Sequence, residues 1–290
     1  MTVVASTRGE LAALRSQVVD SAGGGSIAVV MTMGALHAGH AELIRRARDR
    51  ARVVIVTDFL NPLQFAPGED LDKYPRTFDA DLQLCREERV DLLFAPTPDV
   101  IYPHDDQLVR VSAGPVGDVL EGDSRPGHFD GVVTVVAKLL HLTSPDLAYF
   151  GQKDAQQLWL IDRMVRDLDF PVEVVSVPTV RDEAGLALSS RNVYLDASDR
   201  SAARALSRSL QAGAHAAQRG AESSLAAARE VLAAEGGVRL DYLELVEPFS
   251  FASVSPDYSG EALLLVAAFV GRTRLIDNVR LRLGSGREEE

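Results

Sequence analysis

The chain has 290 residues, 46% of them hydrophobic, which is enough for one large core or two moderate ones. Its formal net charge is −12, from 30 basic against 42 acidic residues, so we expect no broad cationic surface and no nucleic-acid partner. Cys85 is the single cysteine, no stretch has the pattern of a signal peptide, and no apolar run reaches the roughly 20 residues of a membrane span. We therefore expect a cytoplasmic protein without disulfides.

Short apolar, β-branched runs alternate with amphipathic segments in the first part of the chain. Strands are predicted at residues 27–31, 53–57, 92–95, 147–150 and 172–177, and helices at 41–50, 79–89, 131–141 and 155–167. Continuous apolar strands are buried on both faces, and the intervening segments repeat at three- and four-residue spacing. This alternation predicts an α/β fold with a doubly wound parallel sheet.

The pattern changes after about residue 179. Two alanine-rich helices are predicted at 198–218 and 221–234, followed by a glycine turn and strands at 241–246 and 262–270. We expect a larger domain over 1–179, a second, smaller α+β domain over 180–283, and a polar, disordered tail over 284–290.

In doubly wound sheets, ligands bind outside the carboxyl ends of the strands. The loops that follow three predicted strands, at 32–40, 58–64 and 151–154, are rich in polar and glycine residues. We therefore expect these loops to converge on one crevice.

The first of these loops contains His37 and His40, on either side of Gly39, where a strand leads into a helix. The first N–H groups of a helix lack partners and form an anion site, which two imidazoles three residues apart can extend toward a triphosphate. Gly39 allows a nucleotide to approach the backbone. The alternatives are capping or core histidines, or two ligands of a zinc ion.

Neither of two common nucleotide motifs is present. No Gly-x-Gly-x-x-Gly follows the first strand, and no Gly-x-x-x-x-Gly-Lys-Ser/Thr occurs in the chain. The sequence therefore signals neither a nicotinamide cofactor nor a P-loop.

Cationic and hydroxyl side chains elsewhere can also meet phosphates. Lys153 follows a predicted strand, where its ammonium can neutralise charge at an α-phosphate, although a solvated surface lysine is an alternative. Ser189, Ser190 and Arg191 can grip phosphates from a flexible loop, or they can form a turn or helix cap.

Three neutral amides, those of Asn61, Gln64 and Gln157, can hydrogen-bond hydroxyl and carboxylate oxygens of a substrate, although each taken singly fits an ordinary surface or turn residue. Asp79 and Asp81 can assist a magnesium ion through water, and Asp79 is equally placed to cap a helix.

Seven motifs occur in order along nearly the whole chain: Thr32-Met-Gly-Ala-Leu-His-x-Gly-His40, Asn61-Pro-Leu-Gln-Phe65, Tyr74-Pro-Arg-Thr77, Glu121-Gly122, Arg125-Pro-x-His-Phe129, Phe150-Gly-x-Lys-Asp154 and Ser189-Ser-Arg-Asn192. Together they closely resemble the pantothenate synthetase (pantoate–β-alanine ligase) family of HIGH-motif nucleotidyltransferases. The resemblance implies a Rossmann-like ATP domain and a homodimer.

The same resemblance implies a reaction in which the carboxylate of pantoate attacks the α-phosphate of ATP, with magnesium accompanying the nucleotide. β-Alanine then attacks the acyl-adenylate to give pantothenate and AMP. Closure of the smaller domain over the site is expected to protect the adenylate from water.

Site residues follow from the resemblance by motif. Met33 to His40, including Gly34, would contact ATP, with His40 in the proton-donor position. Gln64 and Gln157 would hold pantoate, and Asn61, Tyr74 and His128 would lie toward the amine. The rest of the nucleotide site would be Gly151, Lys153, Asp154, Val180, Leu188, Ser189, Ser190 and Arg191.

Four residues depart from the family pattern. Met31 replaces a proline, Asp58 an apolar residue, Gln152 a glutamate and Ala155 a tyrosine. Met31 and Asp58 are close to the acid-binding loops, so a homologous amide ligase with a different acid or amine is an alternative. A buried Asp58 would need a partner, such as an incoming ammonium.

Two other classes are alternatives. A nucleotidylyltransferase would keep the nucleotide in its product, and amine-dependent release of AMP separates the two activities. A non-catalytic ATP-binding protein is expected to lack Lys153 or one of the histidines, and this chain retains them.

Overall fold

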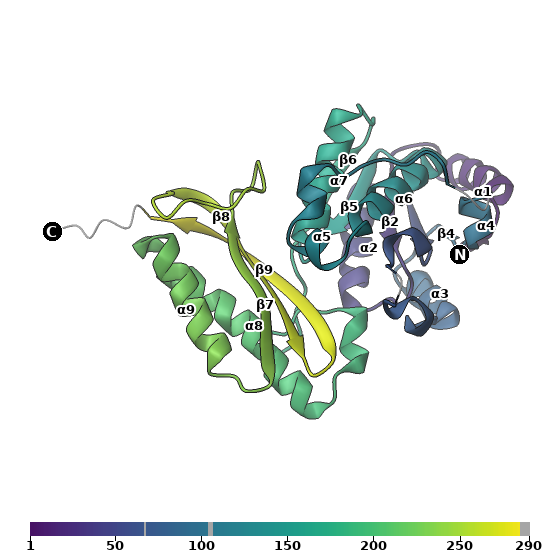
Figure 1. Cartoon of the computed structure of the whole chain (residues 1–290). Helices are drawn as coiled ribbons and strands as arrows, with labels where there is room; N and C mark the ends of the chain where they lie inside the picture. The colour runs from purple at the N-terminus through teal and green to yellow at the C-terminus, as the bar shows by residue number, and fades with distance from the viewer. Residues whose placement is uncertain (67, 104–106, 285–290) are drawn as a thin grey trace. The chain divides into compact units, whose positions relative to one another are not determined.

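The computed structural model describes residues 1–66, 68–103 and 107–284. The chain divides into two compact units, Met1–Gln152 with Gln156–Pro178, and Lys153–Ala155 with Thr179–Glu290 (Figure 1). The sequence placed a domain boundary after residue 179 and assigned Lys153–Ala155 to the larger domain, whereas their contacts assign these three residues to the second unit. The predicted disordered tail lies, from residue 285 onward, outside the described residues.

The first unit contains a six-stranded parallel sheet in the order β1-β4-β3-β2-β5-β6. Its strands are β1 (Val3–Ala5), β2 (Ile27–Thr32), β3 (Val53–Asp58), β4 (Leu92–Phe94), β5 (Leu147–Gly151) and β6 (Glu173–Val177). Its helices are α1 (Arg8–Ser21), α2 (Ala38–Arg50), α3 (Phe78–Glu87), α4 (Pro98–Ile101), α5 (Glu121–Ser124), α6 (His128–Thr143) and α7 (Ala155–Asp167). Short 3-10 helices cover Pro62–Gln64, Asp70–Lys73 and Pro115–Asp118.

Helices cover both faces of this sheet, because alternate side chains of the buried strands point to opposite sides. Val29 and Ile55 pack with residues of α1, α6 and α7, whereas Val30 and Val56 pack with residues of α2 and α3. The prediction of a doubly wound parallel sheet is therefore confirmed.

The strand order brings the predicted site loops to one edge of the sheet. The chain runs from β2 outward to β3 and later returns to place β5 on the other side of β2. Thr32 and Asp58 are paired in register at the carboxyl ends of β2 and β3. This reversal is the topological switch point at which sheets of this class bind ligands.

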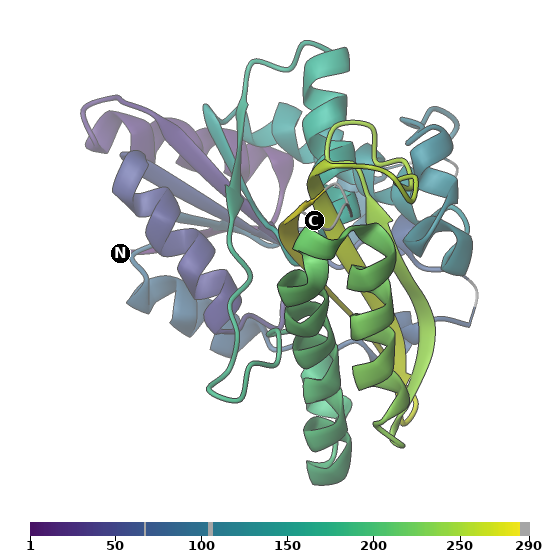
Figure 2. The ribbon, with the colours of Figure 1, turned by 90° about the vertical axis from the view of Figure 1, so that its left-hand side faces the viewer.

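The second unit contains an antiparallel sheet of β7 (Val238–Val246), β8 (Gly260–Val270) and β9 (Thr273–Leu283). Helices α8 (Ala197–Ala216) and α9 (Ala221–Ala233) pack on it with an apolar core shared by all five elements (Figure 2). Short 3-10 helices cover Ser190–Tyr194 and Ala217–Arg219. The smaller α+β domain is thus confirmed.

The sequence prediction missed β1, α1 and β9, as well as the one-turn helices α4 and α5 and the short 3-10 helices. β1 is three residues long, and α1 has a weakly amphipathic sequence that is polar over most of its surface, so neither has strong periodicity. β9 alternates buried with more exposed residues but carries Arg274, Asp277, Asn278 and Arg280. Its strand conformation comes from pairing along the whole length of β8.

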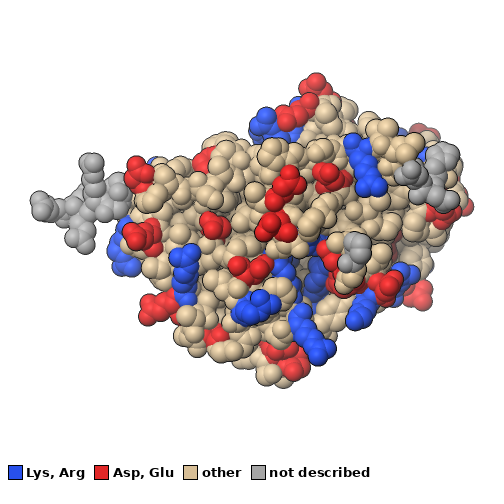
Figure 3. All heavy atoms as spheres, viewed as in Figure 1, with Lys and Arg blue, Asp and Glu red and all other residues tan. Residues whose placement is uncertain are grey.

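Within the described residues, no helix combines the length and apolar character needed to cross a membrane. On the face of the molecule drawn in Figure 3, lysine and arginine side chains are interspersed with acidic groups rather than gathered in one continuous area. That face has no stripe of positive charge of the kind that follows a nucleic-acid backbone.

Candidate active site

The loop after β2 is fixed by hydrogen bonds to its main chain. The hydroxyl of Thr32 donates to the carbonyl of Thr57 at 2.8 Å and accepts from the N–H of Gly34 at 3.2 Å. Gly34 has a φ of +81°, and a Cβ at this position would lie 2.6 Å from Oδ1 of Asp58. A side chain at residue 34 would therefore displace the loop or the carboxylate below it.

His37 and His40 form the N-terminal cap of α2. Nδ1 of His37 accepts from the N–H of Gly39 at 3.1 Å, and Nδ1 of His40 accepts from the N–H of His37 at 3.2 Å. In a neutral imidazole, an Nδ1 that accepts a hydrogen bond leaves the ring proton on Nε2. The cap therefore turns both histidines into Nε2–H donors, with their ring centroids 4.1 Å apart.

The position of this pair adds to its anion-binding character. The sequence predicted a helix from residue 41, but α2 begins at Ala38, so His37 is the N-cap residue and His40 lies in the first turn. The partial positive charge of the helix end and the two ring donors act on the same place. The capping alternative is thus observed, and a cap of this kind leaves ring donors that can suit an anion.

Asp81, on α3, stabilises the middle of the loop after β2. Its buried carboxylate accepts from the N–H groups of Ala35 and Leu36 at 3.0 and 2.7 Å, and from the hydroxyl of Thr77 at 3.1 Å. Ala35 has a φ of +50°, a conformation that costs free energy for a residue with a side chain. Asp81 compensates for that cost, and sequence reasoning assigned it no such role.

Asp58 ends β3 close to Asp81. Burial, and then the negative charge of Asp81, raise the pKa of the Asp58 carboxyl from 3.8 to about 6. Of the four departures from the family pattern, Asp58 is the one that lies against the loop after β2, at Gly34. Met31 packs against the apolar core, and the exposed amide of Gln152 donates to the hydroxyl of Ser176.

Asn61 and Gln64 are both buried in the loop after β3, at 1% and 6% exposure. Nδ2 of Asn61 donates to Oε1 of Gln64 at 3.0 Å, and Oδ1 of Asn61 accepts from the hydroxyl of Tyr102 at 2.8 Å. Nε2 of Gln64 lies 2.7 Å from the sulfur of Met33. The structure therefore joins the loops after β2 and β3, and Asn61 orients the Gln64 amide.

His128 and Arg125 hold the main chain of Gln64. Nδ1 of His128 lies 2.8 Å from the carbonyl oxygen of Gln64, so it is the protonated nitrogen, and Nε2 accepts from Nη1 of Arg125 at 2.9 Å. Arg125 also donates to that carbonyl and to the carboxylate of Glu69. Burial, and then the charge of Arg125, lower the pKa of His128 from 6.5 to about 4. Both ring nitrogens contact protein groups, which makes His128 a support for Gln64.

Tyr74 and Gln157 complete the predicted substrate residues of the first unit. Tyr74 is buried and packs edge-on against Phe65, with the ring centroids 6.1 Å apart. Gln157, on α7, is partly exposed, whereas its neighbour Gln156 is buried. Gln156 donates to the carbonyl oxygens of Val116 and Val119.

Sequence reasoning missed Gln156. The doubled glutamine was the available signal, but it does not say which of the two amides points inward. Successive residues on a helix lie about 100° apart around its axis, so the two side chains face different surroundings.

The second unit brings two of its predicted phosphate ligands, Lys153 and Ser189, to one cavity. A small cavity is lined by Lys153, Ser189, Asn192 and Asp277 together with apolar side chains. Ser189 caps a short 3-10 helix by accepting from the N–H of Arg191 at 3.2 Å, and the N–H of Leu188 donates to the carbonyl of Val180 at 2.9 Å. The predicted turn or cap is thus observed, and it is formed by residues that were also predicted to contact phosphate.

Among residues 1–66, 68–103 and 107–284, no group of three or more His, Cys, Asp or Glu side chains is arranged to hold a metal ion. Asp79 is exposed in the first turn of α3, whose N-cap residue, Thr77, makes no side-chain capping bond. Asp79 therefore does not cap the helix. The carboxylate of Asp81 is committed to the loop.

Comparison with known proteins gives concordant matches. A family model described as pantoate-beta-alanine ligase matches residues 4–280. A pantothenate synthetase of Thermobifida fusca is 56% identical over 290 residues, covering 97% of this chain and 96% of the relative. A pantothenate synthetase of Leifsonia xyli subsp. xyli is 53% identical over 287 residues, covering 98% and 100%.

Solved structures agree. A pantothenate synthetase from Thermus thermophilus has a TM-score of 0.87 and 46% identity, covering 95% of this chain and 98% of that chain. A pantoate-beta-alanine ligase from Francisella tularensis, complexed with beta-gamma ATP and beta-alanine, has a TM-score of 0.79 and 33% identity, covering 96% and 97%. The family predicted from seven motifs is confirmed. This chain belongs to the pantoate–β-alanine ligase family.

Proposed function

We propose that this chain joins pantoate to β-alanine in an ATP-dependent reaction that proceeds through a pantoyl-adenylate. The observation that carries the proposal is the pair of Nε2–H donors that His37 and His40 present at the N-terminus of α2. Adenylation needs fixed donors around a phosphate rather than a covalent nucleophile on the protein.

In the first step, a carboxylate oxygen of pantoate forms a bond to the α-phosphorus of ATP. The bond from that phosphorus to the bridging oxygen breaks, and pyrophosphate leaves. The extra negative charge on the phosphoryl oxygens is stabilised by the Nε2–H groups of His37 and His40 and by the ammonium of Lys153. His40 donates a proton toward the departing pyrophosphate.

In the second step, the neutral amine of β-alanine attacks the carbonyl carbon of the adenylate. The carbon–oxygen bond to the phosphate breaks and AMP leaves, while the nitrogen loses a proton as the amide forms. Gln64 and Gln157 hold pantoate by its hydroxyl and carboxylate oxygens. Asn61 and Tyr74 lie toward the amine, and His128 supports Gln64.

For the nucleotide, we propose contacts to further main-chain and side-chain groups along the chain. They are Met33, Gly34, Gly39, Gly151, Asp154, Val180, Leu188, Ser189, Ser190 and Arg191. Magnesium enters with ATP as part of that substrate, held chiefly by phosphate oxygens, in keeping with the preference of this ion for phosphates and water over all-protein cages. Closure of residues 180–283 over the site stays a prediction.

We also propose a homodimer and a cytoplasmic location. The side chains of Leu108 and Val109 are 83% and 81% exposed, an apolar pair of the kind that a subunit interface covers. ATP and small carboxylic acids are metabolites of the cytoplasm. The molar mass in solution tests the first proposal.

A second candidate is a ligase of the same chemistry with another amine or acid. Asp58 favours it, because a partly buried carboxylate is a natural partner for a substrate ammonium. Release of AMP by purified protein with ATP and magnesium, scanned over hydroxy acids and amines, decides between the two. AMP formed strictly with pantoate and β-alanine supports the first proposal, and turnover with another pair supports the second.

A further inference from the structure

Strand β9 carries two adjacent polar residues, Asp277 and Asn278, at 4% and 9% exposure. The odd-numbered residues of β9, such as Leu275 and Leu281, pack into the apolar core of the second unit. Asp277 is a carboxylate on that apolar side. Asn278 is a buried residue on the opposite side, where Arg280 and other even-numbered residues are more exposed. Polar groups in such positions require strong partners.

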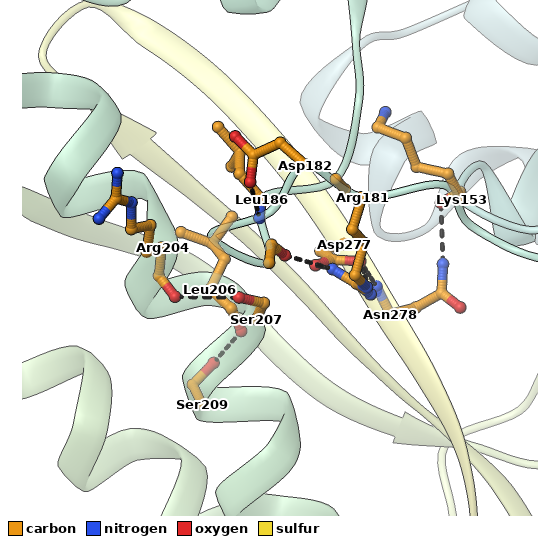
Figure 4. A network of polar contacts seen from close by, with 12 residues as sticks. Lys153, Arg181, Asp182, Leu186, Arg204, Leu206, Ser207, Ser209, Asp277 and Asn278 are labelled. Atoms are coloured by element: carbon orange, nitrogen blue, oxygen red, sulfur yellow. Dashed lines mark hydrogen bonds and ion pairs between the residues drawn. The ribbon is translucent and has the colours of Figure 1, made fainter. Parts of the chain in front are cut away.

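The partner of Asp277 is Arg181. Nη1 and Nη2 of Arg181 donate to the two carboxylate oxygens at 2.5 and 2.9 Å, and the main-chain N–H of Asn278 donates to Oδ1 at 2.8 Å. A two-bond pair of this kind fixes the guanidinium in direction as well as in place. Figure 4 shows Arg181 reaching from its loop to β9.

Arg181 also stabilises a hairpin formed by residues 181–187. Nη1 of Arg181 donates to the carbonyl of Gly185, and Arg181 pairs with Ala187 across a β-bridge. The hairpin runs directly into Leu188 and Ser189. A shift of Arg181 would therefore move the start of the segment that carries Ser189, Ser190 and Arg191.

Asn278 acts on the other predicted phosphate ligand. Its Nδ2 donates to the main-chain carbonyl of Lys153 at 2.8 Å. In Figure 4 the Lys153 side chain leaves the main chain on the side away from this bond. The Asn278 amide thus holds the backbone of Lys153 and leaves its ammonium to other contacts, including one at 3.4 Å from Oδ1 of Asp154.

We propose that Asp277 and Asn278 are positioning residues for the adenylation step, with Asn278 fixing Lys153 and Asp277 fixing, through Arg181, the segment that leads to Ser189–Arg191. Lys153, Ser189 and Asp277 line the same small cavity. Strand β9 therefore positions both Lys153 and the segment that contains Ser189. This inference rests on the proposed roles of Lys153 and Ser189–Arg191 on the phosphates of ATP. Displacement of an oriented group by about 1 Å can lower a rate by roughly a hundredfold.

The test uses the full chain with Asn278→Ala, Asn278→Asp, Asp277→Asn and Arg181→Lys. Each variant is measured for pantoate-dependent exchange of pyrophosphate into ATP, for kcat, and for the KM of pantoate. A separate measurement follows the reaction of preformed pantoyl-adenylate with β-alanine. We expect adenylation to fall by about tenfold to a hundredfold, with a much smaller change in the KM of pantoate and in the second half-reaction.

The matched control is Asp241→Asn. Asp241, on β7 of the same sheet, accepts two hydrogen bonds from Arg274 at 2.9 and 2.8 Å, and it does not line the cavity. This change removes an arginine–carboxylate pair of the same chemistry, so we expect adenylation close to that of the parent. Thermal unfolding of every variant checks that each one is folded in the assays.

Lys153→Ala separates failure of this inference from failure of the proposed function. If Lys153→Ala is inactive while Asn278→Ala and Arg181→Lys adenylate at the parental rate, positioning by β9 is wrong and the function stands. If both half-reactions and the thermal midpoint fall together in all β9 variants, the residues are structural only and the inference is also overturned. If Lys153→Ala is fully active, the phosphate role of Lys153 fails first. Arg181→Lys keeps the charge and serves where Asp277→Asn does not fold.

Discussion

The ring of His40 accepts a hydrogen bond from the main-chain N–H of His37, and the two rings lie 4.1 Å apart at the start of α2. The same contact that begins the helix therefore fixes the ring proton of His40 on Nε2. Helix formation and the chemistry of the site depend on one hydrogen bond here, so a change in this side chain affects both.

For His40→Ala we expect adenylation to fall by about two powers of ten or more, because a donor to the transition state is lost. The measurement is pantoate-dependent exchange of pyrophosphate into ATP. His215→Ala is the control, since His215 lies exposed on α8 and contacts the carbonyl of Gln211. Near-parental exchange in His40→Ala would show that the histidine pair has been misassigned.

Asp81→Ala should weaken both the fold and the binding of ATP. It removes the acceptor of the Ala35 and Leu36 N–H groups, at a cost of about 1–3 kcal/mol for each group left unsatisfied. Urea unfolding and the KM of ATP are the measurements. Asp79→Ala, an exposed position on the same helix, is the control and should change neither. If Asp81→Ala is destabilised but its KM of ATP is unchanged, the Asp81 contacts support the fold and not the binding of ATP.

Asp58 should make the protein less stable as the pH rises. Its folded pKa of about 6 lies above the ordinary 3.8, so the folded state binds the proton more tightly. Stability from this group is present below about pH 4 and is lost as the pH rises through 6. Asp58→Asn should exceed the parent at pH 8 by up to about 3 kcal/mol and match it near pH 4. Urea unfolding at both pH values measures this, and a pH-independent difference would refute it.

His128 should act in the opposite direction. Its folded pKa of about 4 lies below the ordinary 6.5, so the stability it contributes is present above pH 6.5 and is lost as the pH falls through 4. In His128→Asn, the asparagine amide can still donate to the carbonyl of Gln64 but does not titrate. This variant should lose less stability than the parent between pH 6.5 and 4. If both proteins lose the same stability between pH 6.5 and 4, another group is responsible for the acid sensitivity.

The KM of pantoate provides a second check on His128. His128→Phe keeps an aromatic ring but supplies no donor for Gln64, so we expect a higher KM of pantoate than in His128→Asn. Equal values in both variants would mean that the carbonyl contact does not orient Gln64.

Sequence periodicity alone determined much of the first unit. Helix α7 occupies the predicted residues 155–167, and β2, β3 and β5 each extend the prediction by one residue, at Thr32, Asp58 and Gly151. Buried parallel strands and amphipathic helices leave a strong local signal, because each side chain reports which face it buries. The motifs that identified the family are likewise local runs of sequence.

The tertiary structure decided what the individual polar residues do. Asp81 lies 46 residues from the Ala35 N–H that it binds, and Asn278 lies 125 residues from Lys153. His128 became a support for Gln64, and Gln156 rather than Gln157 turned inward. A polar side chain carries no periodic signal for its partner, so its role appears when folding brings a distant group within hydrogen-bonding distance. The same reason explains β9, whose strand conformation depends on pairing with β8.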